Sequence, residues 1–383
     1  MQWPAEPVVL DLPALQLRVG SHFSMEVLVL VETDLELTEL HFWKMNLLAV
    51  SEERGVVAVA NGQSLRLFEL RPDFTVCPVQ DIALPHNSLS SEAPGINRLR
   101  LCRLDDHLGV ALATMDGQAL FFPFNSLTPD LVCLNNYEQE FEDNTTWSVD
   151  CSGSRIAVGS NSHTVAIWEK SQMAVRLRDH AHNVPCVEFS LGGRFLASTS
   201  ISSFLIVWEG DRVVANFSPS EEWGWGVKWL LKSAFLGEAK ESRDSESLQD
   251  YILVHTTQTE IRLFSFNASG DPCLEHEMQD ETANLFGHTR FSLLETLPAL
   301  SLLVVGEWGG TRLYLFRLRK VEAAYTAELT YTHLVPQLLV GLATDSCVHT
   351  NRGRIYLLMT NSTLQVLQVR TEDQSITLSD AFV

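Results

Sequence analysis

The sequence is poor in basic residues. Its 383 residues include 27 lysines and arginines against 48 aspartates and glutamates, which gives a formal net charge of −21. Proteins that bind the phosphate backbone of nucleic acids need Lys and Arg to displace counterions. We therefore expect no direct nucleic-acid binding.

Close cysteine pairs are also absent. The seven cysteines are scattered between Cys77 and Cys347, and no two have the Cys-x-x-Cys spacing. An odd and unclustered set disfavours a disulfide framework and a structural zinc site. It favours free thiols in a reducing compartment, so we expect a nuclear or cytoplasmic location, or both.

Long apolar runs are missing as well. No segment of about 18 consecutive apolar residues occurs, although a helix that spans a bilayer needs about 20. Residues 1–6 lack a basic leader followed by an apolar run, which a secretory signal would have. The sequence predicts no membrane association, while its 45% content of hydrophobic residues is enough for a large core.

Residues 147–208 contain two tandem copies of one pattern. A shift of about 40 residues, the period of a propeller repeat, superposes Ala157 on Ala197 and Val165–Glu169 on Leu205–Glu209. Copies that end in apolar residues, Trp and an acidic residue resemble the WD repeat, in which each copy forms a blade of four antiparallel strands. The second copy has His180, Ser198 and Trp208 at its marked positions.

The WD consensus has a structural Asp where this chain has Ser202. In that consensus the Asp joins the His, Ser and Trp of one blade in a buried set of hydrogen bonds. Its absence predicts a degenerate repeat that is stabilised mainly by packing.

The same pattern of short strands and tight turns extends along the chain. The closing apolar positions of the third strands are Phe68, Phe122, Trp168, Trp208, Phe264, Phe316 and Val366. Their number predicts an all-β fold, a single seven-bladed WD40-type β-propeller over residues 1–383. Strands within residues 8–37 would close the ring, and residues 238–250 would form a polar loop insert. The alternative is eight blades, if residues 8–45 form a blade of their own.

One face of a WD-type propeller carries both the connections between blades and the turns between the middle strands, around the mouth of the central channel. The residues that we expect on this face are Glu221, Glu222, Trp223, Glu307 and Trp308, with His182 and His163 on neighbouring blades. Aromatic and acidic side chains together suit a partner peptide that carries Lys or Arg. The alternative is that these aromatic side chains cap the core.

No catalytic or cofactor-binding motif is found. Phosphate-binding loops, nucleophile elbows, His-Glu-x-x-His helices and Cys-x-x-Cys pairs are all absent from the sequence. His182 and His163 have no acidic or Cys partner at ligand spacing. We therefore expect no enzymatic activity, no cofactor and no bound metal.

Residues 144–163 and 180–209 resemble a fungal WD-repeat family of ribonucleotide reductase transcription regulators. The resemblance implies a role in transcription regulation and association with a cullin ubiquitin-ligase adaptor. Receptors of the cullin class often carry Trp-Asp-x-Arg after a third strand, and residues 208–212, Trp-Glu-Gly-Asp-Arg, approximate that motif.

Two hypotheses about function follow. The first is a non-enzymatic protein-interaction scaffold, as a substrate receptor or a subunit of a ubiquitin-ligase or transcription-regulatory complex. The second is a hydrolase or lyase of the propeller type, with its site at the channel mouth.

Overall fold

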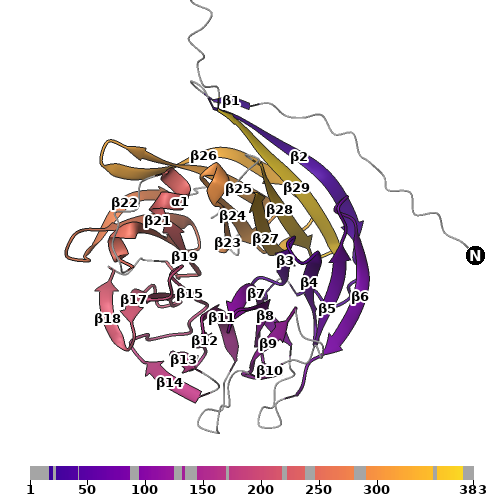
Figure 1. Cartoon of the computed structure of the whole chain (residues 1–383), viewed down its shortest axis with the longest axis horizontal. Helices are drawn as coiled ribbons and strands as arrows, with labels where there is room; N and C mark the ends of the chain where they lie inside the picture. Colours follow the sequence, from indigo (N-terminus) through magenta and orange to yellow (C-terminus); the bar gives the residue numbers. More distant parts are fainter. Residues whose placement is uncertain are drawn as a thin grey trace, which may run out of the picture.

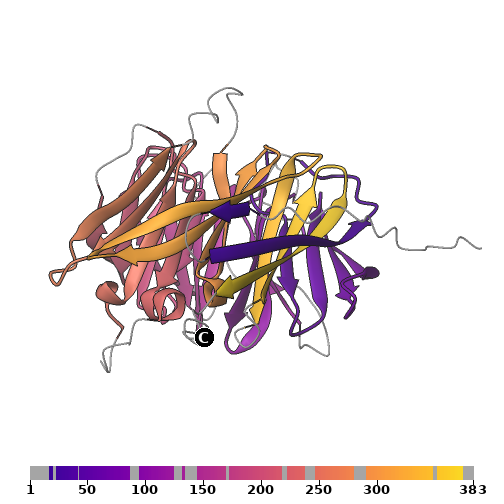
Figure 2. The ribbon, with the colours of Figure 1, turned by 90° about the horizontal axis from the view of Figure 1, so that it is seen from above.

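The strands of the chain are arranged in a ring around a central channel (Figure 1). The computed structural model describes residues 17–19, 23–41, 43–86, 95–124, 132–133, 145–169, 172–217, 222–237, 246–279, 290–347 and 352–373. Figure 2 shows the ring from the side, with the strands of each sheet running across its thickness.

The described strands fall into seven groups. Five are separate four-stranded antiparallel sheets, and the other two are joined in one nine-stranded sheet. The junction in that sheet is a parallel bridge between Trp308 and Leu339, so the groups on its two sides act as separate blades. We number the blades one to seven from β3 onward.

Blades one to four follow each other in the chain. Their strands are β3 (Leu48–Ser51), β4 (Val56–Asn61), β5 (Ser64–Leu70), β6 (Val76–Ala83); β7 (Ile96–Leu104), β8 (His107–Thr114), β9 (Ala119–Pro123), β10 (Val132–Cys133); β11 (Thr146–Ser152), β12 (Arg155–Ser160), β13 (Val165–Glu169), β14 (Gln172–Leu177); and β15 (Cys186–Phe189), β16 (Phe195–Thr199), β17 (Leu205–Glu209), β18 (Arg212–Asn216).

Blades five to seven complete the ring. Their strands are β19 (Gly226–Leu231), β20 (Tyr251–Thr256), β21 (Glu260–Phe266), β22 (Pro272–Gln279); β23 (Arg290–Leu297), β24 (Leu302–Trp308), β25 (Arg312–Val321), β26 (Ala324–Leu334); and β27 (Leu339–Cys347), β28 (Arg352–Met359), β29 (Thr363–Asp373), with β2 (Phe23–Asp34) and β1 (Leu17–Val19).

The second strand of each blade is largely buried because neighbouring blades cover both of its faces. In β4 the four central residues are buried, and β12 and β20 are buried in the same way. The Asn61-Gly62 turn joins β4 to β5 and needs a positive φ, which Gly62 adopts at 59°. The largest core cluster joins side chains of β3–β5, β7–β9 and β27–β29, so the core lies between blades and not within one sheet.

An N-terminal strand closes the ring. β2 pairs antiparallel with β29 along its whole length, from Phe23 opposite Asp373 to Asp34 opposite Thr363, and the two strands run side by side in Figure 1. The Leu35 amide also donates to the Ser362 carbonyl at 3.0 Å. The outer strand of blade seven therefore comes from the opposite end of the chain.

Blade four keeps part of the hydrogen-bonded set that the WD consensus describes. Trp208 is buried and its Nε1 donates to Ser198 Oγ at 2.8 Å. That hydroxyl also lies 2.7 Å from His180 Nε2. Ser202, at the consensus Asp position, bonds to Ser200 at 2.6 Å instead. The repeat is thus degenerate at Ser202, as expected, but His180, Ser198 and Trp208 remain linked by hydrogen bonds in addition to their packing.

The expected polar insert is only partly a loop. A short helix, α1 (Lys232–Leu236), precedes it, and residues 238–245 lie outside the described part of the chain. After them the 3-10 helix η1 (Leu248–Asp250) buries Leu248 against blades four and five. The Glu246 carboxylate accepts from the Arg194 amide at 3.0 Å and from Tyr251 Oη at 2.6 Å. The expectation of a polar loop over 238–250 is thus wrong for its last five residues, which pack on the domain.

We predict that Trp208 stabilises blade four both by volume and by its hydrogen bond. Trp208→Ala should lower the free energy of unfolding by about 3–5 kcal/mol, and Trp208→Phe, which loses the bond to Ser198, by about 1–2 kcal/mol. Urea denaturation measures both changes. Val213→Ala, at an exposed site in the next strand, is the control and should change stability by less than about 0.5 kcal/mol. A Trp208→Ala variant as stable as wild type would contradict a core role.

We also predict a loss of stability in mild acid. Burial lowers the pKa of His180 to about 4, against 6.5 for an exposed histidine. Below pH 6.5 the unfolded chain therefore binds a proton that the folded chain does not, and stability present above pH 6.5 is lost as the pH falls towards 4.

At pH 5 the loss due to His180 should reach about 2 kcal/mol. His180→Gln should remove that part of the pH dependence in denaturation curves recorded at pH 7 and pH 5. His86→Gln, at an exposed position, controls for the loss of one histidine. If His180→Gln kept the full wild-type dependence, the assignment to His180 would be refuted.

Candidate functional site: the channel-mouth face

The connections between blades and the turns between second and third strands open on one face, because consecutive strands in each blade run antiparallel. We call it the channel-mouth face. Its described segments include residues 35–41, 43–47, 178–185 and 222–225 between blades, and the turns at 61–64, 161–164, 257–259 and 309–311. The inner strands β3, β7, β11, β15, β19, β23 and β27 line the channel below it.

A buried network of ion pairs crosses the channel. Arg100, on β7, lies 3.2 Å from Asp150 on β11 and 3.7 Å from Glu295 on β23, and it also pairs with Glu188 on β15. Lys228, on β19, lies 3.2 Å from Glu188 and 2.9 Å from Glu295. One guanidinium and one ammonium group thus connect the inner strands of blades two to six.

Two of the three carboxylates of this network also accept backbone hydrogen bonds from the following blade. Asp150 Oδ2 accepts from the Phe189 amide at 2.7 Å, and Glu188 Oε2 accepts from the Trp229 amide at 2.9 Å. Asp150 and Glu188 are therefore each bound to the blade after their own. A buried charge is tolerated only when its partners satisfy it in this way.

Charge and burial act in opposite directions on the network. Burial raises the pKa of Asp150 despite the adjacent Arg100. Burial would also raise the pKa of Glu295, but the charges of Lys228 and Arg100 outweigh it and lower that pKa. Burial would lower the pKa of Arg100, but the charges of the three carboxylates outweigh this effect and raise that pKa. The raised pKa of Arg100 and the lowered pKa of Glu295 both favour the charged forms, which preserves the ion pair between them.

A cavity of about 170 Å³ lies beside this network, lined by Arg100, Lys228 and Glu295 together with residues of β3, β7 and β27. The second hypothesis, a hydrolase or lyase, would need free acidic or metal-binding groups at the channel. Asp150, Glu188 and Glu295 are instead bound to cations. Among the residues that the structure describes, no group of three or more His, Cys, Asp and Glu side chains could hold a metal ion.

A row of three tryptophans crosses the channel mouth. Trp225 stacks on Trp308 with ring centroids 6.2 Å apart and planes 17° apart, and Trp223 lies 6.3 Å from Trp225. Trp225 and Trp308 are buried, whereas 47% of Trp223 is exposed. The Trp308 Nε1 donates to the Lys44 carbonyl. Trp223 is thus an exposed aromatic ring at the end of a fixed stack.

Two expected surface residues are buried. Glu307 and Trp308 were expected on a loop, but both belong to β24 and are 3% and 5% exposed. Glu307 accepts from Tyr314 Oη at 2.7 Å. The reason is that β24 continues as far as the turn at 309–311, where its last residues meet the neighbouring blade. For Trp308 the structure agrees with the alternative hypothesis, in which the aromatic ring caps the core.

Glu222 is on the channel-mouth face, but its carboxylate is used within the fold. It accepts from Thr257 Oγ1 at 2.7 Å and from the Thr259 amide at 2.8 Å. These bonds fasten the connection before β19 to the β20–β21 turn. Glu221 lies outside the described residues.

His163 and His182 are brought together from neighbouring blades. Both are exposed, and their ring centroids lie 5.4 Å apart. His182 Nδ1 accepts from the Asn183 amide at 2.8 Å, which leaves Nε2 free to face solvent. A structural zinc ion takes four protein ligands, so this pair alone does not form such a site. A role in protein binding stays a prediction for both.

Sequence reasoning missed a second exposed tryptophan on this face. Trp43 is 38% exposed, and its ring stacks with His41 at 5.7 Å. The Lys44 Nζ lies 4.0 Å from the centroid of the Trp43 ring and donates to Asn97 Oδ1 at 2.8 Å. The signal was the aromatic and basic run at residues 41–44, His-Phe-Trp-Lys, just after the ring-closing strand.

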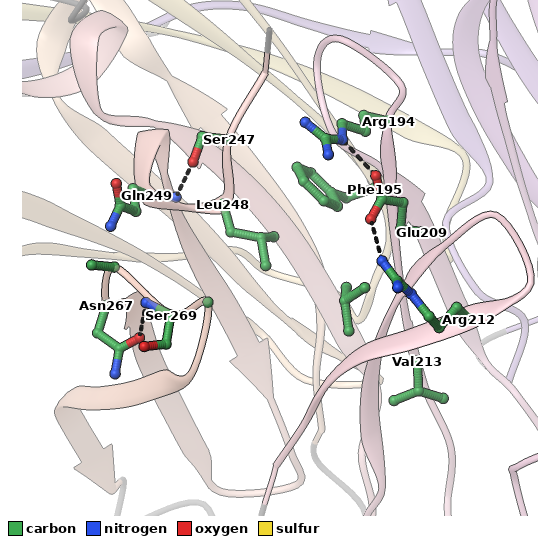
Figure 3. Close-up of a pocket in the computed structure, with 13 residues that line it drawn as sticks. Arg194, Phe195, Glu209, Arg212, Val213, Ser247, Leu248, Gln249, Asn267 and Ser269 are labelled. Atoms are coloured by element: carbon green, nitrogen blue, oxygen red, sulfur yellow. Dashed lines mark hydrogen bonds and ion pairs between the residues drawn. The ribbon is translucent and has the colours of Figure 1, made fainter. Parts of the chain in front are cut away.

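A cleft on the opposite face lies between blades four and five (Figure 3). It measures about 510 Å³ and is lined by Arg194, Arg212, Ser247 and the turn at 267–270. Glu209 pairs with Arg194 at 2.7 Å and with Arg212 at 3.1 Å, as the dashed lines in Figure 3 show. Because one carboxylate engages both guanidinium groups, we assign no anionic ligand to this cleft.

No helix in the described residues is long and apolar enough to cross a bilayer.

Known protein families, compared as sequence models, give no match to the chain. A WD40 repeat-containing protein of Dictyostelium discoideum is 24% identical over 196 residues, 49% of this chain and 28% of that protein. An uncharacterized WD repeat-containing protein of Schizosaccharomyces pombe is 25% identical over 227 residues, 51% and 45% of the two chains. The matches span less than half the length of these curated relatives.

Solved structures match over most of the chain. A chain in the crystal structure of the mitotic checkpoint complex has a TM-score of 0.62 at 12% identity and covers 89% of this chain and 93% of its own. The WD40 β-propeller domain of Doa1 has a TM-score of 0.60 at 12% identity, with 89% and 96% covered. The fold is thus a closed ring of β-sheet blades, a β-propeller of the WD40 type. Its resemblance to the fungal transcription regulators stays a prediction.

We predict that Arg100 is required for stability because its loss leaves buried carboxylates with too few cations. Arg100→Met should lower the free energy of unfolding by about 3–5 kcal/mol. Arg103→Met removes an exposed arginine of the same strand, which pairs with Glu53 at 3.4 Å, and should cost less than about 1 kcal/mol. Chemical denaturation at neutral pH compares the two. Equal losses would show that the cross-channel network contributes no more than a surface ion pair.

Proposed function

We propose that this chain is a protein-interaction scaffold that binds a partner through its channel-mouth face. The observation that carries the proposal is Trp223, a large aromatic side chain that is 47% exposed at the end of an ordered row of rings. Tryptophan is enriched among the residues that dominate binding energy at protein interfaces. A ring that is already fixed loses little conformational entropy when a partner covers it.

The rest of the face supports a platform. The ion pairs of Arg100 and Lys228 lie across the channel, and the buried pair of Trp225 and Trp308 lies at its mouth. A partner that approaches this face therefore meets side chains from several blades. The net charge of −21 favours a segment with Lys or Arg, since complementary charge raises association rates and selects partners.

The similar proteins support the general form of this proposal. The two relatives are described as WD repeat-containing proteins, and one structural neighbour is a chain of the mitotic checkpoint complex. Membership of a multiprotein assembly is what we propose for this chain as well, in the nucleus or the cytoplasm.

A narrower form of the proposal is a substrate receptor or subunit of a ubiquitin-ligase or transcription-regulatory complex. Its support is Arg212, whose side chain is 74% exposed just after the third strand of blade four. It follows Trp208 by one residue more than in the Trp-Asp-x-Arg motif. In this form a cullin adaptor should co-purify with the chain, and Arg212→Ala should remove that adaptor alone.

We predict that Trp223→Ala removes the main partners of the chain without unfolding it. A truncated interface tryptophan typically costs about 2 kcal/mol or more, so recovery should fall by about tenfold or more. Affinity purification with quantitative mass spectrometry measures the recovery, and thermal melting checks the fold. Leu274→Ala, also in blade five and 54% exposed, controls for the loss of an exposed apolar side chain. A folded Trp223→Ala variant with an unchanged partner list would refute this binding face.

A further inference from the structure

A second cavity opens on the channel-mouth face where blade seven passes to blades one and two. It measures about 200 Å³. Its apolar lining consists of Leu47, Ala60, Ile96, Met115 and the ring of Trp43. The remaining wall comes from Glu39, His41, Lys44 and the backbone around Gly62, Gln63 and Gly95. The cavity therefore combines an apolar interior with a polar wall.

Glu39 supplies a fixed negative charge at this cavity. Its amide donates to Asn61 Oδ1 at 3.1 Å, its carbonyl accepts from the Gly62 amide at 3.3 Å, and its carboxylate lies so close over Gly62 that a Cβ there would overlap it. The residue is exposed, and its carboxylate makes no ion pair with the described residues. An unpaired carboxylate held in one place is suited to a cation from outside the chain.

Lys44 decides which part of a ligand enters the cavity. Its ammonium group is buried, bonded to Asn97 at 2.8 Å and placed over the Trp43 ring at 4.0 Å. A second cation in the interior would be repelled by Lys44 and would lose its hydration. An apolar side chain meets neither cost, because it would contact the apolar part of the lining formed by Leu47, Ile96 and Met115. The interior thus favours an apolar side chain, while a cation is favoured only near Glu39.

We infer that this cavity binds a short peptide segment of a partner protein in which a large apolar residue lies next to a Lys or Arg. The apolar side chain fills the space between Trp43, Ile96 and Met115, and the basic side chain pairs with Glu39 at the surface. The inference rests on the proposed scaffold function. It adds a second contact, besides Trp223, between the channel-mouth face and a partner. Trp43 is joined to the tryptophan row through Lys44, whose carbonyl accepts from Trp308.

Gly95 offers a way to fill the cavity without disturbing the fold. A Cβ at this position would meet Lys44 Nζ and Met115 Cγ at 3.5 Å and the Gly62 carbonyl oxygen at 3.9 Å, which are ordinary van der Waals distances, and the Gly95 backbone is not in the left-handed region. Gly95→Leu should therefore place an apolar side chain in the cavity. Thermal melting within a few degrees of wild type would verify that the variant is folded.

The probe is a displayed library of random linear peptides, selected on the full wild-type chain. The enriched peptides should share a large apolar residue adjacent to Lys or Arg. Fluorescence anisotropy with one enriched peptide then gives Kd for each variant. Gly95→Leu and Trp43→Ala should each raise Kd by about tenfold or more, as expected for the anchor of an interface. Trp43→Ala keeps the test valid if Gly95→Leu fails to fold.

Charge provides an independent arm. Glu39→Gln should raise Kd several-fold at low salt and less at high salt, because screening weakens an exposed ion pair. Glu36→Gln removes an equal charge three residues earlier, outside the cavity, and should leave Kd unchanged. Leu191→Ala, 76% exposed on the opposite face, should also leave it unchanged.

The outcomes separate this inference from the proposed function. If Trp223→Ala weakens peptide binding while Gly95→Leu and Trp43→Ala do not, the cavity is not the binding site, but the scaffold proposal stands. If the cavity variants abolish binding and Trp223→Ala has no effect, the cavity is supported, and the role of Trp223 is wrong. Failure to enrich any peptide, or enrichment of acidic peptides, would overturn the inference about the cavity.

Discussion

The placement of the inner strands depends on one buried guanidinium group. Arg100 contacts carboxylates from three other blades, and Lys228 binds two of these carboxylates. Burying an ion without a partner would cost several kcal/mol. These charges therefore favour the one spacing between blades at which every buried ion contacts its partner. The backbone bonds that Asp150 and Glu188 accept from the next blade extend that constraint around the ring.

The candidate binding surface lies above the channel. The stacked rings of Trp225 and Trp308 lie at the channel mouth and leave Trp223 exposed at one end. The closure of the ring contributes too, because β2 on β29 brings residues 35–47 from the N-terminal side of the chain to this mouth. That segment carries Glu39 and Trp43. The same strand pairing therefore completes the fold and places Glu39 and Trp43 on the binding face.

The candidate site could be predicted only in part. The repeat pattern correctly indicated that Glu222, Trp223, His163 and His182 lie in connections on one face, because turns follow directly from the order of the strands. It could not show that Glu222 is bound by two threonines of another turn. Trp308 was misplaced for a similar reason, since the length of β24 depends on the neighbouring blade. Those partners are remote in sequence, so no local pattern reveals them.

By itself the sequence determined the class of fold. A period near 40 residues, apolar runs between turn residues and a Trp at the end of a third strand depend on neighbours within one repeat, and short-range patterns record such neighbours. Tertiary structure decided which charged and aromatic side chains are free. Arg100 and Glu295 are far apart in the chain and meet across the channel, while Glu39 and Trp43 border a cavity that blades one and two complete. Long-range contacts of this kind arise only when the ring closes.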